Sequence, residues 1–194
     1  MHRLSSSFVL AYHGCDQSVA ERLLQNEDFE RSTNEYDWLG DGVYFWEANP
    51  DRARQWALEQ KARDKIKIPY VIGAVVDLGF CLDLTTSNGI QAIESSYKNL
   101  KLSIDEANFK LPSNSGGKDR LLRRLDCAVV NYLHTVREED GEPPFDSVRG
   151  LFPEGQEIYP TSGFQSKTHI QICVRNQENI HGVFRVKERY FSEE

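Results

Sequence analysis

The chain has 194 residues, of which 39% are hydrophobic and 11% aromatic; this suits one compact domain with a buried core and argues against two full domains. The formal net charge of −7 argues against a broad nucleic-acid-binding surface, which needs many Lys and Arg side chains to neutralise phosphates. No window approaches the roughly 20 apolar residues of a membrane span, and the first residues are too polar for a signal peptide, so we expect a cytoplasmic protein without membrane contact.

A strand followed by a short helix is expected at the start of the chain. Ser7 to Tyr12 is an apolar run that predicts a buried strand, and it leads directly into His13. Ser18 and Glu21 have the spacing of a capping box, which predicts that a helix begins here. The following segment, residues 29–41, is polar and typical of turns.

A second strand and a second helix are expected next. Val43 to Trp46 predicts a short strand, and Asn49-Pro50-Asp51 supplies a cap, a first-turn proline and a first-turn acid in the order that begins a helix. Four residues share one face of this helix: Ala53, Trp56, Ala57 and Gln60. Tyr70 to Leu78 is a continuous β-branched run between Pro69 and Gly79, which predicts a central strand.

The pattern becomes helical between residues 85 and 140. Apolar residues recur at helical spacing in two sets, which are Ile93, Tyr97, Leu100 and Ile104, and then Leu121, Leu125, Val129 and Tyr132. A loop rich in Ser, Asn and Gly separates the two sets at 111–117. We expect a helical insertion over about 85–140, whose apolar faces either pack on the sheet or offer a docking surface.

Two strands are expected near the end of the chain. Thr168 to Arg175 alternates, with His169, Gln171 and Cys173 on one face, and His181 to Lys187 alternates less cleanly. The α+β class is predicted rather than regular βαβ winding, because the order of elements is strand, helix, strand, helical insertion and then paired strands. The whole chain, 1–194, is expected to form a single domain.

The cysteines occur singly, without a CxxC pair. Their positions, Cys15, Cys81, Cys127 and Cys173, predict reduced thiols and suggest neither a disulfide framework nor a zinc knuckle. A mixed site built from the pairs His13/Cys15 and His169/Cys173 is conceivable, but buried apolar cysteines are the favoured interpretation. We therefore expect no metal site.

Two short segments indicate a nucleotide site. Tyr12-His13-Gly14 and Leu39-Gly40-Asp41-Gly42-Val43-Tyr44-Phe45-Trp46 each join a strand-like run to a reactive or stacking side chain beside glycine. Glycine has no Cβ, so the backbone beside His13 and Tyr44 can approach a flat ligand closely. A polar residue combined with an aromatic face suits a nucleotide.

At these residues the chain resembles the ADP-ribosyltransferase superfamily, in the His-Tyr-Glu branch of the poly(ADP-ribose) polymerases and diphtheria-type toxins. In that branch a His-Gly strand, a Gly-x-Tyr-Phe strand leading into a helix, and a Glu on a later strand build one NAD site. The resemblance implies a split mixed or antiparallel sheet with flanking helices, and NAD as co-substrate. The stretches Leu-Gly-x-Gly-x-Tyr-Phe-Trp-Glu and Lys-Thr-His-Ile-Gln-Ile are also similar to bacterial proteins of unassigned role.

The resemblance implies roles for individual residues. His13 would hydrogen-bond the adenosine ribose, backbone groups of Gly14 would hold the nicotinamide carboxamide, and Tyr44 would stack on the nicotinamide ring. Trp56 would offer a second aromatic wall or else pack in the core. The segment that carries Ser32, Asn34, Asp37 and Trp38 would cover the donor nucleotide, and Arg31 or Arg149 would pair with a phosphate, with ordinary loop chemistry as the alternative for each. Gly42 is also expected to contact NAD.

The third catalytic position carries an amide. Gln171 stands where the glutamate of the family would fall, so the implied catalytic set is His13, Tyr44 and Gln171. An amide can hydrogen-bond a ribose hydroxyl but is no general base, which favours a single transfer over chain elongation. Three residues are candidates for acid–base work or acceptor binding, with surface acids and a structural histidine as the alternatives: Glu154, Glu157 and His169.

The expected function is that of an NAD-dependent mono-ADP-ribosyltransferase that modifies a protein or a nucleic acid, as a bacterial toxin or phage-defence effector. The alternatives are a catalytically silent NAD- or ADP-ribose-binding module and an NAD glycohydrolase. An inhibitory antitoxin or regulatory partner would dock on the helical insertion.

The chain has one dense basic cluster, formed by Lys118, Arg120, Arg123 and Arg124. The favoured interpretation is a solvated helix face. The cluster supports a nucleic-acid acceptor only if it lines one groove with Tyr44 and with the aromatic residues Phe145, Phe152 and Tyr159.

Overall fold

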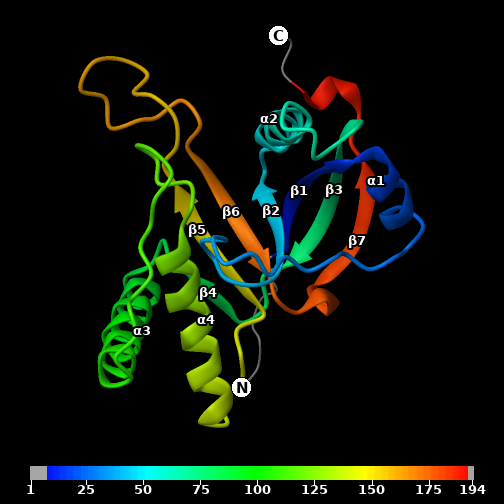
Figure 1. The fold of residues 1–194 in the computed structure, drawn as a ribbon. Coiled ribbons are helices and arrows are strands. Elements are labelled where there is room, and N and C mark those ends of the chain that lie inside the picture. Colours follow the sequence, from blue (N-terminus) through cyan, green and yellow to red (C-terminus); the bar gives the residue numbers. More distant parts are fainter. Residues whose placement is uncertain (1–7, 192–194) are drawn as a thin grey trace.

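The computed structural model describes residues 8–191, which contain four α-helices and seven β-strands. All of these strands belong to one sheet (Figure 1). The elements are β1 (Phe8–Asp16), α1 (Gln17–Leu23), β2 (Val43–Glu47), α2 (Pro50–Lys61), β3 (Pro69–Asp77), β4 (Cys81–Asp83), α3 (Ser87–Glu106), α4 (Arg124–Glu139), β5 (Ser147–Phe152), β6 (His169–Val174) and β7 (Ile180–Arg185). Ser7, the first residue of the first predicted strand, lies outside the described residues.

The strands are ordered β4-β5-β6-β2-β1-β3-β7 in the sheet. Neighbouring strands are antiparallel except for β4 and β5, which are parallel. A parallel pair needs a long crossover connection, and α3 and α4 lie in that connection. The mixed sheet with its flanking helices agrees with the α+β class.

Most of the expected elements are present, with corrections at their edges. The run at 70–78 forms β3, the alternating run at 168–175 forms β6, and residues 85–140 contain α3 and α4 with a loop between them. Leu121 lies in that loop, before the first residue of α4. Neither β4 nor β5 was expected, because a three-residue strand and a strand interrupted by glycine carry little periodic signal.

The cap of α1 is Asp16 and not Ser18, so the capping-box prediction is wrong in its position. Asp16 accepts a hydrogen bond from the backbone N–H of Ser18 at 3.1 Å, and it also accepts from the N–H groups of Lys67 and Ile68 at 2.7 and 3.1 Å. The bond from Ile68 is the largest cause that lowers the pKa of Asp16, followed by those from Ser18. One carboxylate therefore joins the end of β1, the start of α1 and the approach to β3.

The helix that begins after Asn49 is capped as expected. Asn49 Oδ1 accepts a hydrogen bond from the Arg52 N–H at 2.9 Å, and Pro50 occupies the first turn. Because Pro50 has no N–H to lose there and its φ is already helical, it helps to start the helix. The buried residues of α2 include Ala53, Ala57 and Gln60, which confirms the predicted inward face.

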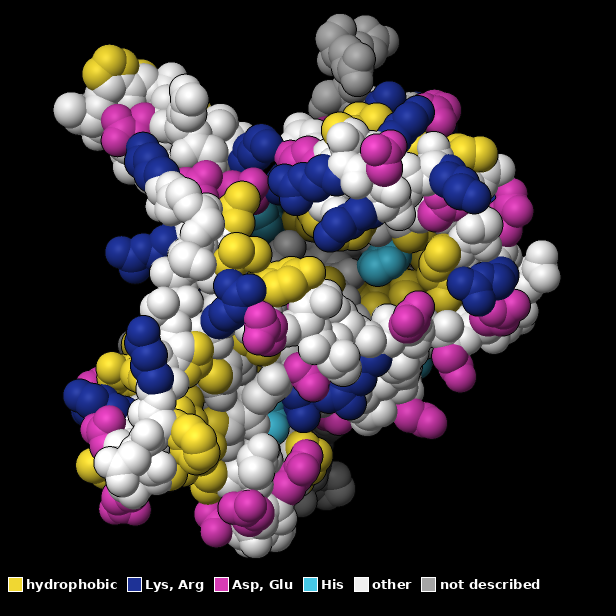
Figure 2. Space-filling view, in the orientation of Figure 1, with side chains coloured by type: hydrophobic (Ala, Val, Ile, Leu, Met, Phe, Trp, Pro, Cys, Tyr) yellow, Lys and Arg dark blue, Asp and Glu magenta, His cyan; other side chains and the backbone are white. Residues whose placement is uncertain are grey.

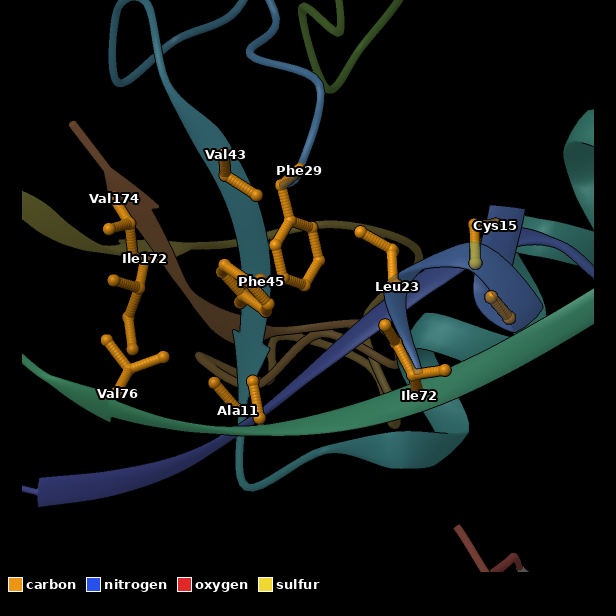
Figure 3. Close-up of a cluster of buried hydrophobic side chains, with 12 residues drawn as sticks. Ala11, Cys15, Leu23, Phe29, Val43, Phe45, Ile72, Val76, Ile172 and Val174 are labelled. Carbon is orange, nitrogen blue, oxygen red and sulfur yellow. The ribbon is translucent and has the colours of Figure 1, made fainter. Parts of the chain in front are cut away.

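The largest hydrophobic cluster covers the face of the sheet next to α1 (Figure 3). Phe45 and Ile72 are fully buried at its centre, and Phe29 packs edge-on against Phe45 with 5.3 Å between ring centroids. The other buried members are Ala11, Cys15, Ala20, Leu23, Val43, Ala74, Val76, Ile172 and Val174. Burial raises the pKa of the Cys15 thiol to about 12.

Two separate clusters lie on the opposite face of the sheet. Trp46, one residue after Phe45, points to that face and packs with Ala53 of α2. Cys173, one residue after Ile172, packs there with Val130 of α4. Since α2 and α4 cover different ends of this face (Figure 1), a strip of sheet between them stays open to a ligand.

The apolar face of α3 packs inside the molecule rather than forming a free docking surface. Ser96 Oγ donates a hydrogen bond to the Val129 carbonyl of α4 at 2.8 Å, and Ile93 packs against the cluster around Val130. All four cysteines are unpaired. Within residues 8–191, no helix combines the length and the apolar character needed to cross a bilayer.

His134 of α4 is a buried imidazole without a hydrogen-bond partner. Its side chain is 2% exposed, its ring packs edge-on against Phe145 at 5.8 Å, and neither ring nitrogen has a partner among the described residues. Burial, followed by the charge of Arg175, lowers the pKa of His134 to about 3. The native protein therefore keeps this ring neutral at pH values where an unfolded histidine is charged.

We expect His134→Leu to flatten the acid dependence of stability. Between about pH 6.5 and 3, His134 is protonated in the unfolded chain but not in the native protein, so the free energy of unfolding falls as pH falls. This group contributes a slope of up to about 1.4 kcal/mol per pH unit. Urea unfolding of both proteins between pH 7 and 4 measures the difference, and equal slopes would contradict the assignment.

Candidate functional site

The sheet opens between β1 and β2. These strands pair only at Ala11–Glu47 and Tyr12–Trp46, whereas β1 pairs with β3 along its whole length. Just past the last pair, His13 Nδ1 lies 2.8 Å from the backbone oxygen of Tyr44. The side chain of His13 therefore bridges the strands where their backbone pairing ends.

This hydrogen bond fixes the tautomer of His13. A carbonyl oxygen can only accept, so Nδ1 carries the proton and Nε2 of the neutral ring is an acceptor. Burial lowers the pKa of His13, against the bond to Tyr44, which raises it. Phe29 and Phe45 pack around the ring at centroid distances of 5.5 and 5.7 Å. The result is a neutral imidazole that lines the opening and offers an acceptor nitrogen.

The side chain of Tyr44 is held by the turn that precedes β2, the strand on which Tyr44 lies. Its hydroxyl donates to the Gly40 carbonyl at 2.7 Å and accepts from the Leu39 N–H at 3.0 Å. Gly40 has φ +77°, a left-handed conformation that favours glycine. Burial raises the pKa of Tyr44 well above its ordinary value. The hydroxyl is thus a structural group, and what Tyr44 offers to the open strip is its ring.

Gln171 lies opposite Trp46 in the β2–β6 ladder and faces the same opening. The indole Nε1 of Trp38 donates a hydrogen bond to Gln171 Oε1 at 2.6 Å. An indole N–H has no acceptor capacity, so the amide oxygen must face Trp38. The NH₂ group of Gln171 then remains for a ligand, and this position offers hydrogen-bond donors where a carboxylate would offer acceptors.

The two glycines of the motifs are explained by packing of the chain on itself. A Cβ at residue 14 would lie 2.4 Å from the Ala53 carbonyl oxygen of α2, and one at residue 42 would lie 2.5 Å from Cys173 Sγ. Both glycines also line the cavity described below. Packing of the chain already requires glycine at these positions, and close approach of a ligand would be a second reason for it.

A polar segment borders the opening on the side of Asp37. The hydroxyl of Ser32 donates to Asp37, and Asn34 Nδ2 donates to Ser32 Oγ at 2.8 Å. Ser32 also forms an isolated β-bridge with Gly42. Burial raises the pKa of Asp37. These bonds fix the segment that was expected to cover the donor nucleotide.

Glu154 is a buried ion-pair partner, which overturns its interpretation as a surface acid. Both of its carboxylate oxygens accept from Arg52 Nη2 at 2.9 Å, and the side chains of Arg52 and Glu154 are 6% and 8% exposed. Arg52 also lies 6.0 Å from the centroid of Trp46. The pair fastens α2 to the loop of residues 153–168, and it leaves Glu154 engaged rather than available as a base.

His169 has one engaged nitrogen and one free nitrogen. Nδ1 lies 2.7 Å from the Lys167 carbonyl oxygen and so carries the proton. Nε2 is buried and has no partner among the described residues. Burial is the largest cause that lowers the pKa of His169. The ring stacks on Phe152 at 5.4 Å. The residue lines the cavity, and its unpaired Nε2 is itself buried.

These groups surround a cavity of about 560 Å³, within the range of about 300–1,000 Å³ of small-molecule sites. It is lined by ten of the residues that the sequence assigned to the site, namely His13, Gly14, Ser32, Asn34, Gly42, Tyr44, Trp56, Glu154, His169 and Gln171. Glu157 lines a second hollow instead. Figure 2 shows the cavity as a central depression with apolar side chains.

Several other residues behave differently from expectation. Arg149 forms ion pairs with Glu47 and Asp83 at 2.6 and 3.2 Å, and neither Arg149 nor Arg31 lines the cavity. Of the basic cluster, Lys118, Arg120 and Arg123 precede α4 and only Arg124 lies in it, so the cluster is not a helix face. Phe145 packs against Phe80 and His134, away from the site. Tyr159 and Lys118 line the second hollow rather than the cavity that contains Tyr44, so the single groove expected for a nucleic-acid acceptor is formed only in part.

Two further lining residues, Trp46 and Arg52, were not expected in the site. Trp46 carried a usable signal, because it lies two residues after Tyr44 on one strand and so shares its face. Arg52 carried none, since its partner Glu154 is 102 residues away.

The four residues of the conceivable mixed metal site do not assemble. Cys15 packs on the α1 side of the sheet and Cys173 packs below α4 on the other side. Among residues 8–191 there is no cluster of three or more His, Cys, Asp or Glu side chains placed to hold a metal ion.

Comparison with known proteins finds a similar chain of undescribed activity. An uncharacterized protein of Methanocaldococcus jannaschii is 26% identical over an alignment of 192 positions that covers 87% of this chain and 83% of that protein. No family model matches the chain, and no solved structure matches it.

We expect Glu154→Gln to destabilise the protein by about 3 kcal/mol, because it leaves the buried Arg52 charge with only Glu59, whose Oε1 lies 3.7 Å from Arg52 Nη1. The double variant Arg52→Met/Glu154→Met removes both charges and is expected to cost less. Denaturant unfolding measures both.

The exposed pair Glu94–Lys98 of α3, whose side chains are 59% and 65% exposed, is the matched control. Glu94→Gln makes the same chemical change and is expected to leave the unfolding midpoint nearly unchanged. A Glu154→Gln midpoint equal to that of the control would contradict the assignment.

Proposed function

We propose that this protein is an NAD-dependent mono-ADP-ribosyltransferase that transfers ADP-ribose from NAD to a macromolecular acceptor and releases nicotinamide. The observation that carries the proposal is the opening between β1 and β2, where His13, Tyr44, Trp56 and Gln171 line one cavity. We further propose that this opening corresponds to the split sheet of the ADP-ribosyltransferase fold.

The residues present fit NAD. His13 Nε2 is an acceptor suited to a ribose hydroxyl, the ring of Tyr44 offers an aromatic face, and Trp56 lies beside Trp46 at 5.6 Å between centroids to form a second aromatic wall. The cavity volume of about 560 Å³ and its mixed polar and aromatic lining suit a nucleotide.

NAD would supply the ADP-ribosyl group by breaking its ribose–nicotinamide bond, whose electron pair leaves on nicotinamide. Positive charge develops on the sugar in such reactions, as in glycoside hydrolysis. Gln171 would donate a hydrogen bond to a ribose oxygen and so position the sugar, without the charge of a carboxylate. His169 Nε2 would take the proton of the attacking acceptor group, because its own ring is neutral and this nitrogen is free.

One observation favours a second candidate, a catalytically silent NAD- or ADP-ribose-binding module. Trp38 holds the Gln171 oxygen away from the ligand, so the charge stabilisation expected of a catalytic carboxylate is lacking. An NAD glycohydrolase, in which water is the acceptor, is the nearest enzymatic variant. Nicotinamide release and product analysis separate these three functions.

The biological role that we propose is that of a cytoplasmic toxin or phage-defence effector restrained by an inhibitory partner. The packing of α3 on α4 leaves the solvent sides of both helices as the surface of the helical insertion. Expression with and without candidate neighbouring proteins, scored by growth and by cellular NAD content, tests this role.

We expect Tyr44→Ala to reduce nicotinamide release from NAD by at least about 100-fold, because the aromatic wall of the cavity is lost. Tyr44→Phe keeps the ring and removes only the hydroxyl bonds to Leu39 and Gly40, so it is expected to retain most activity with lower stability. Tyr132→Ala, on α4 outside the cavity, is the control. Full activity of Tyr44→Ala would place the site elsewhere.

We expect Gln171→Glu to raise nicotinamide release about tenfold with water as acceptor, and Gln171→Ala to lower it. A carboxylate keeps an acceptor for Trp38 Nε1 and adds negative charge where positive charge develops. Release is followed by chromatography of the free base. If the wild type binds NAD but no acceptor elicits release, the silent-module candidate is supported; equal loss in both variants would contradict the role given to this position.

A further inference from the structure

Cations without an acidic partner gather on two sides of the cavity. Arg63 and Lys65 follow α2 and line the cavity, and Lys118 and Arg120 lie in the loop of residues 107–123 that precedes α4. All four are exposed, and their side chains have neither an ion pair nor a hydrogen bond among residues 8–191. Figure 2 shows Lys and Arg side chains above and to the left of the central depression.

Two carboxylates that line the cavity are already paired with cations, while Glu30 and Asp37 line it without an ion pair in the described part of the chain. Glu59 accepts from Lys167 Nζ at 2.7 Å, and Glu154 accepts from Arg52 at 2.9 Å. Pairing removes these negative charges from competition with a ligand. Arg63 and Lys65 on this rim therefore meet no competition from Glu59 or Glu154, although the chain as a whole carries a net charge of −7.

A second hollow continues the cavity outward along the rim. Lys118 and residues 156–160 line it, while Leu121, Leu122 and Arg123 of the same loop line the main cavity. Between the two, Asp119 Oδ2 accepts a hydrogen bond from the Gly155 N–H at 3.2 Å, which joins the loop of residues 107–123 to that of residues 153–168. The same two loops therefore border both hollows, and we treat the cavity and the second hollow together as one groove.

The outer hollow combines an aromatic face with a cation. Tyr159 is 55% exposed there and shares the hollow with Lys118. Phe164, on the same projecting loop (Figure 1), is 67% exposed. Exposed rings beside a basic track are the combination that binds single-stranded nucleic acid, because every base can stack and every phosphate can pair.

We propose that this groove binds a single-stranded polynucleotide, and that nucleotides of this strand are the acceptors of the transfer; the second part rests on the proposed function. Phosphates contact Lys118, Arg120, Arg63 and Lys65, and a base stacks on Tyr159. A groove for a single strand is compatible with the net negative charge of this protein, because it needs few cations, whereas a surface that binds a duplex needs many.

The transfer balances without a further reactant. A nitrogen or oxygen of the bound nucleotide forms the new bond to the ribose carbon as the bond to nicotinamide breaks, and the bonding electrons leave on nicotinamide. The proton of the attacking group passes to His169 Nε2 and then to solvent.

Binding is tested first, without NAD, by fluorescence anisotropy with unmodified 12-nucleotide RNA and DNA strands. Four phosphate contacts predict a slope of log K against log salt of about −3. Lys118→Glu/Arg120→Glu is expected to weaken binding at least tenfold and to halve the slope, and Tyr159→Ala to weaken it about tenfold. The control Lys101→Glu/Lys187→Glu makes the same change of charge at exposed positions that line neither hollow, and is expected to bind like the wild type.

Labelled NAD is then supplied with RNA, DNA or total cellular protein. Label on one kind of strand, lost in Lys118→Glu/Arg120→Glu, supports the proposal and identifies the acceptor. The proposal is overturned if the label appears on protein while no strand is bound or labelled. It is also overturned if strands bind but the groove variants bind them as well as the wild type does. If strands bind through the groove while NAD is never consumed, the groove stands and the proposed function fails.

Discussion

The hydrogen bond from the His13 ring to the Tyr44 carbonyl determines how far the sheet stays closed. On one side of this bond, β1 is followed in the sheet by β3 and β7. On the other side, β2 is followed by β6, β5 and β4. Two backbone pairs and this side-chain bond join β1 to β2. A full ladder would fill the opening with backbone, and a wider gap would lose the cluster around Phe45. The imidazole keeps the strands at a spacing that leaves room for a ligand.

The polar groups of the cavity share one principle. In each side chain, a hydrogen bond from one polar atom to the protein decides whether the other polar atom donates or accepts. The Tyr44 carbonyl makes His13 Nε2 an acceptor, and the Lys167 carbonyl does the same for His169 Nε2. Trp38 occupies the amide oxygen of Gln171 and leaves its NH₂ group as a donor. These orientations cost a ligand no ordering entropy when it binds. The cavity therefore selects ligands by their pattern of donors and acceptors as well as by size.

Sequence reasoning succeeded where the signal is local. The run at 70–78, the alternation at 168–175 and the cap at Asn49 depend on neighbouring residues, and they predicted β3, β6 and the start of α2. It failed where distant partners decide: Asp16 caps α1 and also binds Lys67 and Ile68, some 51 residues away, and Glu154 is buried because Arg52 meets it. That ten of the expected residues would line one cavity could be predicted from the sequence, whereas the orientation of Gln171 could not, because Trp38 sets it from a distance of 133 residues.

The place of β6 in the sheet has a consequence for synthesis on the ribosome. This strand lies between β5 and β2, yet it is the sixth of seven strands along the chain and carries both Gln171 and His169. While residues 169–174 are still inside the exit tunnel, no strand joins β4 and β5 to β2, β1 and β3. A nascent chain at this stage lacks the part of the cavity wall that Gln171 and His169 provide.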